Sequence, residues 1–330
     1  LLYQAIPISI TVEGANILTR SLMIFGQGSM RCHPYLFEEL QLLQMDDKKT
    51  ALKEMNTILY QHLGYTFNRT ARALAYGFTG GSNHAPNNVD YFTAPYYKII
   101  NRFSTTFALT ADMCLGLLAG EIKRKEMLSG RLADIHSYMF IATSILKFYE
   151  HGEHTQAELS HAQLALDKVL FQAQEAFIGL FDNFPYPLAA SLVKFICFPF
   201  GRPIVQPSDK LKQQVGDLIM EDNAFRNLLK QHVYYNTDPQ DVTGRMECAF
   251  QSLLQIKDLW DKFKKSESKD LFKGLTFEEH IHDAIQINFI TQAEANRLLE
   301  YNAIRYDSML TDIFNEHLSE VLSLENHHLP

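Results

Sequence analysis

Apolar residues recur along most of the chain at intervals of three and four, which is the spacing of an amphipathic α-helix. Between residues 50 and 76 the apolar positions that fall on one helical face are Leu52, Met55, Leu59, Leu63, Phe67 and Leu74. Strict alternation of apolar and polar residues, the pattern of a half-buried β-strand, is absent throughout. The pattern therefore predicts an all-α protein, a multi-helix bundle without a substantial sheet.

The same spacing, together with helix start and stop signals, predicts where the individual helices lie. The expected helices cover residues 16–32, 36–43, 50–76, 95–118, 138–150, 155–182, 187–198, 208–232, 241–265, 276–285 and 291–323. Two of them begin with a capping box, Thr276 with Glu279 and Thr291 with Glu294. Residues 77–88 form the clearest loop. The loop is rich in glycine but lacks the Lys-Ser/Thr pair of a phosphate-binding loop, so we expect a plain connection between helices.

One acidic residue, Glu13, interrupts the apolar and small residues at the start of the chain. Apolar side chains precede it, Pro7 prevents a helix from running into it, and Gly14 follows it directly. A carboxylate in such surroundings is costly to leave ionised, so we expect its pKa to rise toward the range useful for a general base. The alternative is an ordinary acidic residue before the helix that starts near Asn16, stabilised by the helix dipole. The residues alone leave both interpretations open.

The surrounding motif bears on this choice. The stretch Val12-Glu13-Gly14-Ala15-Asn16-Ile17, continued through Arg20 to Arg31-Cys32-His33-Pro34-Tyr35, resembles acyl-CoA dehydrogenases. It is more closely similar to their long bacterial fatty-acid β-oxidation branch, which carries a large extra C-terminal region. In that family a Glu-Gly-Thr segment carries the catalytic base. Glu13 falls on the base and Gly14 on the glycine, whereas Ala15 replaces the threonine whose hydroxyl helps to hold the flavin diphosphate.

The resemblance implies a flavin-dependent enzyme that oxidises a fatty acyl-CoA to trans-2-enoyl-CoA. Glu13 would take the α proton while hydride leaves the β carbon for the flavin. Gly14, Ala15 and Asn16 would lie beside FAD, and Arg20 falls on an arginine that often follows the base by seven positions. The family further implies electron-transfer flavoprotein or a similar electron acceptor as a partner, and a homo-oligomer of the full-length protein.

The resemblance also suggests how the chain is divided. Residues 1–45 correspond to the end of the dehydrogenase core, and residues 46–330 to an additional all-helical domain. In the family an N-terminal helical domain, a β-barrel and most of a helical bundle precede the base and supply most of the flavin site. The chain opens inside an apolar segment and without Met. We therefore expect it to be part of a longer protein that binds FAD largely elsewhere, and to be inactive alone.

Composition narrows the remaining possibilities. The formal net charge is −8, which argues against a general nucleic-acid binder. The four cysteines are scattered without zinc spacing, so we expect reduced thiols and a cytoplasmic protein. His280 and His282 point to different sides of a helix, so we expect no metal site there.

A second class of function stays open for the helical region, namely an interaction module that docks a membrane or a protein partner without catalysis of its own. Residues 184–202 carry a single charge before their terminal arginine and are too short between prolines to span a bilayer. A buried core helix and a membrane-surface or partner-docking helix both fit this composition. The second interpretation would place the protein at the periphery of the inner membrane.

Overall fold

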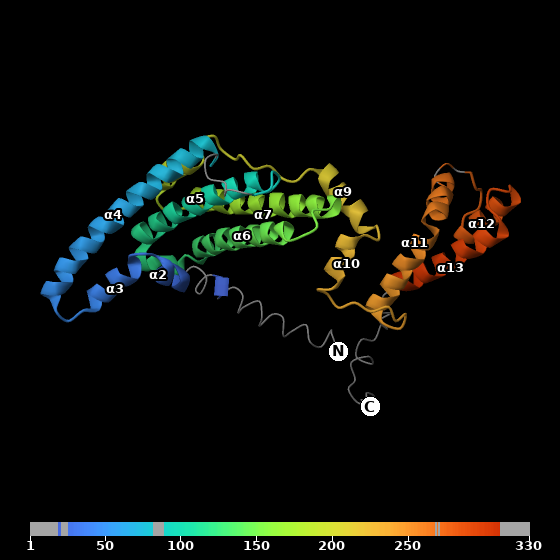
Figure 1. Ribbon diagram of the computed structural model, residues 1–330, viewed down its shortest axis with the longest axis horizontal. Coiled ribbons are helices and arrows are strands. Elements are labelled where there is room, and N and C mark those ends of the chain that lie inside the picture. Colours follow the sequence, from blue (N-terminus) through green and yellow to red (C-terminus); the bar gives the residue numbers. More distant parts are fainter. Residues whose placement is uncertain (1–18, 21–25, 82–88, 268, 270, 311–330) are drawn as a thin grey trace, which may run out of the picture. The chain divides into compact units, whose positions relative to one another are not determined.

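The computed structural model describes residues 19–20, 26–81, 89–267, 269 and 271–310, and these residues contain helices and no strand (Figure 1). The prediction of an all-α protein is therefore confirmed. The contacts divide the chain into two compact units, residues 1–217 and residues 218–330. The boundary expected near residue 45, between the end of a dehydrogenase core and an additional domain, stays a prediction.

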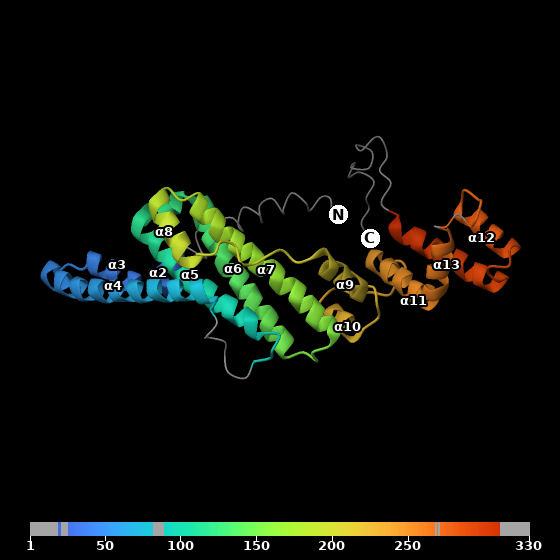
Figure 2. The ribbon, with the colours of Figure 1, turned by 90° about the horizontal axis from the view of Figure 1, so that it is seen from above.

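The first unit is built around four long helices, α4 to α7, with shorter helices packed against them (Figures 1 and 2). Figure 2 shows α3 running beside α4, and the contacts place α8 against α4, α5 and α7. The bounds are α2 Gly28–Cys32, α3 Leu36–Gln44, α4 Lys48–Thr79, α5 Ala94–Leu118, the 3₁₀ helix η2 Ala119–Arg124, α6 Glu126–Glu150, α7 Gln156–Asp182, α8 Pro187–Cys197 and α9 Asp209–Ile219.

The core of this unit forms where α5, α6, α7 and α8 meet. Phe103 of α5 is fully buried and lies edge-on to Phe177 of α7, with ring centroids 5.4 Å apart. Cys114 and Cys197 are fully buried free thiols, and burial raises the pKa of each to about 12. Among the described residues, α5 with η2 is long and apolar enough to cross a membrane by length and composition. Its burial among the other helices is that of a core helix.

Helices α4 and α8 cross so closely that only a glycine fits between them. A Cβ at Gly77 would lie 2.5 Å from the carbonyl oxygen of Ile196. Gly77 is buried in the last turns of α4, and the helix ends at Gly80, whose φ of 65° is left-handed. The predicted loop over residues 77–88 is therefore wrong for its first three residues, because packing against α8 keeps them helical.

The residues predicted to form the apolar face of α4 lie on a helix, as expected, but most of them do not face the core. Leu52, Leu63 and Phe67 are exposed, while the buried positions of α4 are the small or amphipathic residues Ala51, Ala73, Tyr76 and Gly77. Most of the apolar stripe predicted for this helix is therefore exposed, although Leu59 and Leu63 line a cleft beside Leu109 and Met113 of α5.

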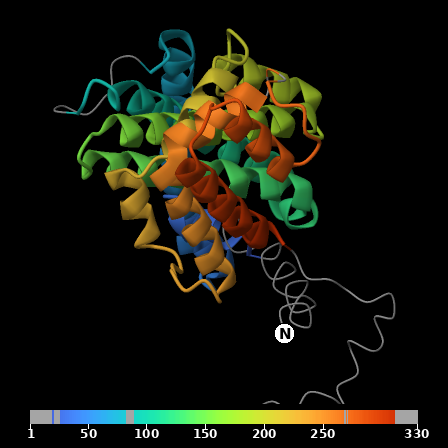
Figure 3. The ribbon, with the colours of Figure 1, turned by 90° about the vertical axis from the view of Figure 1, so that its right-hand side faces the viewer.

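The described part of the second unit contains the helices α10 Ala224–Lys230, α11 Val242–Glu267, α12 Phe277–Gln286 and α13 Gln292–Met309. Helices α11 and α13, orange and red in Figure 3, pack against each other. Their core includes fully buried Phe263 and Leu298, and Trp260 lies edge-on to Tyr301 at 4.8 Å. Both predicted capping boxes, at Thr276 and Thr291, are confirmed.

Two helix predictions near the unit boundary and the C-terminus are wrong. The helix expected over 208–232 is broken between α9 and α10, because extended Asn223 accepts a hydrogen bond from the N–H of Arg226 and caps a new helix. The amide of Asn223 also donates to the carbonyl of Leu218 at 2.7 Å. The helix expected over 291–323 ends at Met309, where Leu310 turns to extended backbone.

Candidate functional site

The four residues that the resemblance assigns to catalysis and to FAD, namely Glu13, Gly14, Ala15 and Asn16, lie outside the described residues. The structure describes the later part of the motif, namely Arg20 and residues 26–35. These residues lie against α3, α5 and α6, and their contacts define how the segment that follows the predicted base is held.

Arg20 forms a two-armed ion pair with Asp134 of α6. Its Nε donates to Oδ1 at 2.6 Å, and its Nη2 donates to Oδ2. The hydrogen bonds to this carboxylate raise the pKa of Arg20. Gly130, one turn earlier on α6, provides the space, because a Cβ there would lie 3.3 Å from the guanidinium carbon. The guanidinium that follows Glu13 by seven positions is thus fixed to the helical bundle.

His33 fixes the end of the motif through both ring nitrogens. Its Nδ1 accepts hydrogen bonds from the backbone N–H of Tyr35 at 3.3 Å and of Leu36 at 3.1 Å. These groups open α3, where N–H groups lack partners within the helix. The ring proton therefore sits on Nε2, which donates to Oδ1 of Asp112 at 3.1 Å. This bond joins the motif to the middle of α5.

A second histidine packs beside the first. The rings of His62 and His33 lie 4.8 Å apart, and Tyr35 stacks on His62 at 5.4 Å. Nδ1 of His62 donates to Oε1 of Glu39 at 2.7 Å. The pair links α3 to α4, so that three helices and the motif segment meet at one cluster of polar side chains.

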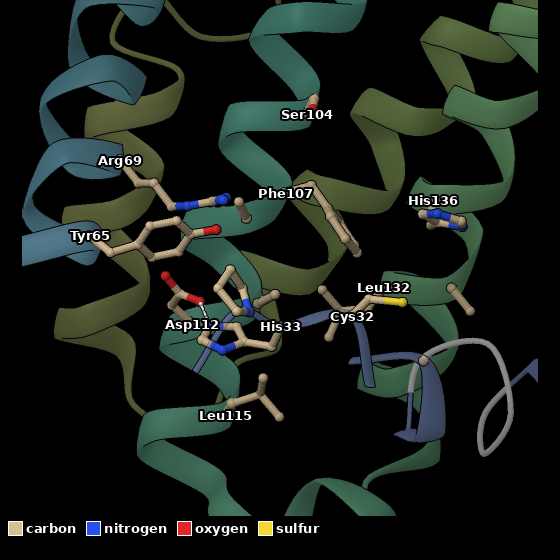
Figure 4. Close-up of a pocket in the computed structure, with 15 residues that line it drawn as sticks. Cys32, His33, Tyr65, Arg69, Ser104, Phe107, Asp112, Leu115, Leu132 and His136 are labelled. Carbon is tan, nitrogen blue, oxygen red and sulfur yellow. Dashed lines mark hydrogen bonds and ion pairs between the residues drawn. The ribbon is translucent and has the colours of Figure 1, made fainter. Parts of the chain in front are cut away.

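A cavity of about 500 Å³ opens beside this cluster, with walls from residues 28–34, α4, α5 and α6 (Figure 4). In Figure 4 the side chains of Tyr65, Arg69, Asp112 and His33 gather at one end, and Phe107, Leu132 and His136 line the other. The cavity is therefore apolar along most of its length and polar at one end, which is the usual composition of a small-molecule site.

The polar end contains a buried acceptor and a buried donor without hydrogen bonds to other described residues, Oδ2 of Asp112 and Nε of Arg69. The Asp112 side chain is 8% exposed. The guanidinium carbon of Arg69 lies 3.9 Å from the centre of the Tyr65 ring. Burial lowers the pKa of Arg69, and the negative charge of Asp112 offsets only part of this effect. A hydroxyl, an amide or a water could satisfy both groups, whereas Asp112 would repel a diphosphate.

The geometry of His33, His62 and Asp112 resembles a metal site, since one ligand atom of each lies within 4.8 Å of the others. The tautomer of His33 argues against it. A metal on Nε2 would move the ring proton to Nδ1, where it would face the N–H groups of Tyr35 and Leu36. In known metal sites the ring nitrogen that does not bind the metal donates a hydrogen bond to an acceptor, whereas Nδ1 of His33 faces two donors. Hydrogen bonding to Asp112 is the role that the surroundings of His33 support.

The sequence prediction did not identify the residues of α4 and α5 that complete this cluster, Tyr65, Arg69 and Asp112. One signal was available for Asp112, which is the single charged residue between Phe103 and Leu118. A lone carboxylate within an apolar helix must find hydrogen-bond donors when the helix is buried. Nothing in the sequence indicates that the donor would come from His33, 79 positions away.

Fold and site together define a helical domain that receives the end of a preceding segment through two acid–base pairs, Arg20 with Asp134 and His33 with Asp112. The comparisons identify that domain. The family described as acyl-CoA dehydrogenase, C-terminal, bacterial type matches residues 30–314, and the chain belongs to this family. The resemblance stated from the N-terminal motif is thereby confirmed. No solved structure matches the chain.

Proposed function

We propose that this chain forms the C-terminal part of a FAD-dependent acyl-CoA dehydrogenase that oxidises fatty acyl-CoA to trans-2-enoyl-CoA, with Glu13 as the base. The observation that carries the proposal is the family match over residues 30–314, which begins within the last residues of the motif that contains Glu13. The anchoring of Arg20 and His33 supports it, because a base needs a fixed backbone to reach one particular proton.

In this proposal Glu13 acts twice. Its carboxylate takes the α proton, and its backbone N–H donates to the thioester oxygen, where negative charge develops. From the apolar residues next to Glu13 in the sequence, we expect the pKa of this carboxylate to be raised toward that of a useful base. Gly14 has no Cβ and lets the backbone turn close to the reacting groups. These roles follow from the resemblance and from the residue types.

FAD would accept the hydride from the β carbon. The described residues do not fit its diphosphate, because the cavity beside His33 presents the buried carboxylate of Asp112. We therefore propose that FAD is held largely by parts of the protein outside this chain, with Gly14, Ala15 and Asn16 contributing at its edge, and that the chain alone is inactive.

The test is Glu13→Gln in the full-length enzyme, which keeps the shape of the side chain and removes its basicity. Enoyl-CoA formation with electron-transfer flavoprotein or an artificial acceptor should fall by at least about a thousandfold, the size of a general-base contribution. Glu38→Gln, an exposed acid on α3, is the matched control and should retain the parent rate. A Glu13→Gln rate within about tenfold of the parent would contradict the assignment.

A second candidate function is docking to the surface of a membrane, and one observation favours it. Helix α8 buries Ala190, Val193 and Cys197, whereas Leu188, Leu192 and Phe195 share the opposite, exposed face. Leu188 is 89% exposed. The segment expected to be either a core helix or a docking helix is thus buried on one face and apolar on the other, as interfacial helices are. Such docking would place a cytoplasmic enzyme at the inner membrane, where long acyl chains partition.

This second function is tested by co-sedimentation with vesicles of an anionic and zwitterionic lipid mixture. A triple variant, Leu188→Ser with Leu192→Ser and Phe195→Ser, should lose most vesicle binding. Leu275→Ser, equally apolar and 96% exposed in the second unit, is the control. Equal binding by both variants would exclude α8 as the docking face, and no binding by the parent would exclude the function.

A further inference from the structure

Helix α4 presents an apolar stripe that the other described residues leave largely exposed, apart from an edge-on contact of Phe78 with Phe200 at 5.4 Å. The exposed fractions are 78% for Tyr60, 65% for Leu63, 78% for Phe67, 39% for Leu74 and 51% for Phe78. Gly64 and Ala71, which lie between them on the same face, are exposed as well. The stripe runs over five turns of helix with no charged residue in it, which is unusual for a surface in water.

The stripe has the spacing of a coiled-coil seam. Its positions follow one another at intervals of four, three, four, three and four residues: Tyr60, Gly64, Phe67, Ala71, Leu74 and Phe78. This is the d-to-a and a-to-d alternation of a heptad repeat. We call these six residues the α4 seam. Its d positions, Tyr60, Phe67 and Leu74, are large, and its first two a positions, Gly64 and Ala71, are small.

The alternation of large and small residues selects one partner and one direction. In an antiparallel pair of identical helices each a position faces a d position of the other copy. With the two-fold axis at the level of residue 69, Gly64 faces Leu74, Ala71 faces Phe67, and Tyr60 faces Phe78. The inner layers then combine one large and one small side chain, as close packing requires. A parallel pair would place Phe67 opposite Phe67 and Gly64 opposite Gly64. Layers with steric overlap would then alternate with layers that contain voids.

Charge and area agree with this pairing. The residues that flank the seam are uncharged, namely Gln61, Leu63, Asn68, Thr70, Ala75 and Gly77, so two copies meet without repulsion between like charges. The five large exposed side chains offer on the order of 500 Å² per protomer, given 150–250 Å² for a whole aromatic side chain. Stable interfaces bury about 800 Å² per partner, so these side chains alone supply more than half of that area.

We infer that the α4 seam binds the α4 seam of a second copy of this chain, antiparallel and around a two-fold axis near residue 69. The inference stands on the sequence and exposure of α4 and is independent of the proposed catalytic function. It names the surface through which two copies associate, with Phe67 and Ala71 at its centre.

The first test exchanges the two central residues and measures association of the chain by sedimentation velocity over a range of concentrations. Phe67→Ala leaves two voids and Ala71→Phe overfills two layers, so each should weaken the dimer by about 100-fold. The double variant Phe67→Ala/Ala71→Phe restores one large and one small residue in each layer and should regain most of the affinity. Phe140→Ala, an exposed aromatic residue on α6, is the control.

The second test reads the direction of the pair by disulfide formation in a Cys32→Ser/Cys248→Ser background, which removes the thiols that are not buried. Gly64→Cys and Leu74→Cys should form no covalent dimer when each is oxidised alone, and should form one when the two proteins are mixed. Gly64 can accept the substitution, since a Cβ there meets nothing within 4 Å. Covalent dimers of Gly64→Cys alone would overturn the antiparallel arrangement.

Two further outcomes would overturn the inference altogether. The first is a parent chain that stays monomeric at about 100 μM, far above the dissociation constants of specific dimers. The second is a monomeric parent that co-sediments with lipid vesicles while Phe67→Ala does not, because the seam would then bind a membrane in place of a second copy.

Discussion

Nε2 of His33 donates a hydrogen bond to Oδ1 of Asp112 across 3.1 Å, and this bond connects the end of the N-terminal motif to the middle of α5. The histidine also accepts the backbone N–H groups that open α3. One side chain thereby fixes the direction in which the chain leaves the motif and enters the helical domain.

His33→Ala should destabilise the first unit by about 2–3 kcal/mol, because it leaves the largely buried Asp112 carboxylate without its donor. Urea unfolding followed by circular dichroism measures the change. In an Asp112→Asn background the same substitution should cost at least about 1 kcal/mol less, since the unpaired charge is then absent. His136→Ala, on the opposite wall of the cavity, is the control, and equal costs in both backgrounds would contradict the coupling.

Asp134→Asn should loosen the motif segment without unfolding the protein. The pair with Arg20 is half exposed on the arginine side, so its loss should cost about 1 kcal/mol or less in global stability. Hydrogen exchange read by mass spectrometry should nevertheless accelerate in peptides that contain Arg20. Asp182→Asn breaks the comparable surface pair with Lys194 and should leave those peptides unchanged. Unchanged exchange in Asp134→Asn would show that other contacts hold the segment.

Gly77→Ala should destabilise the first unit by about 1–3 kcal/mol, because the new Cβ would lie 2.5 Å from the carbonyl oxygen of Ile196. The helices α4 and α8 must separate to admit it. Gly116→Ala on α5 is the matched control, since its Cβ meets nothing within 4 Å. That control should be neutral or stabilising by up to about 1 kcal/mol, as expected for glycine replaced in a helix. Thermal unfolding of both variants provides the comparison.

Glu247 should make the second unit sensitive to acid. Burial alone would raise its pKa, but hydrogen bonds from Arg226, Lys230 and Gln251 outweigh burial and lower the pKa to about 2. The folded pKa thus lies below the unfolded value near 4.5. The group therefore stabilises the fold above pH 4.5, by about 2–3 kcal/mol, and this contribution is lost as the pH falls toward 2.

Glu247→Gln should remove that contribution at neutral pH and flatten the dependence of stability on pH between about 4.5 and 2. The single tryptophan, Trp260, belongs to the core of the second unit, so its fluorescence reports the unfolding of this unit. Glu300→Gln, an exposed acid on α13, is the control and should behave as the parent does. A parent-like acid profile in Glu247→Gln would assign the acid sensitivity to other groups.

The sequence by itself determined the all-α class, most of the helices and the family. Helical spacing and capping boxes such as Thr276 with Glu279 are local signals, and the structure agrees with them because nearby residues produce them. The order and identity of the residues around Glu13 indicated the family, and this information does not depend on the fold.

Only the tertiary structure decided which surfaces meet. The stripe of α4 has the same periodicity whether it faces a core or water. Its exposure follows from the fold, which places Ala73 and Gly77 on the packed face of the helix. The partner of Asp112 comes from 79 positions earlier, and the space at Gly77 is set by the backbone of α8. Contacts of this kind depend on how whole helices cross, and helical periodicity contains no information on that crossing.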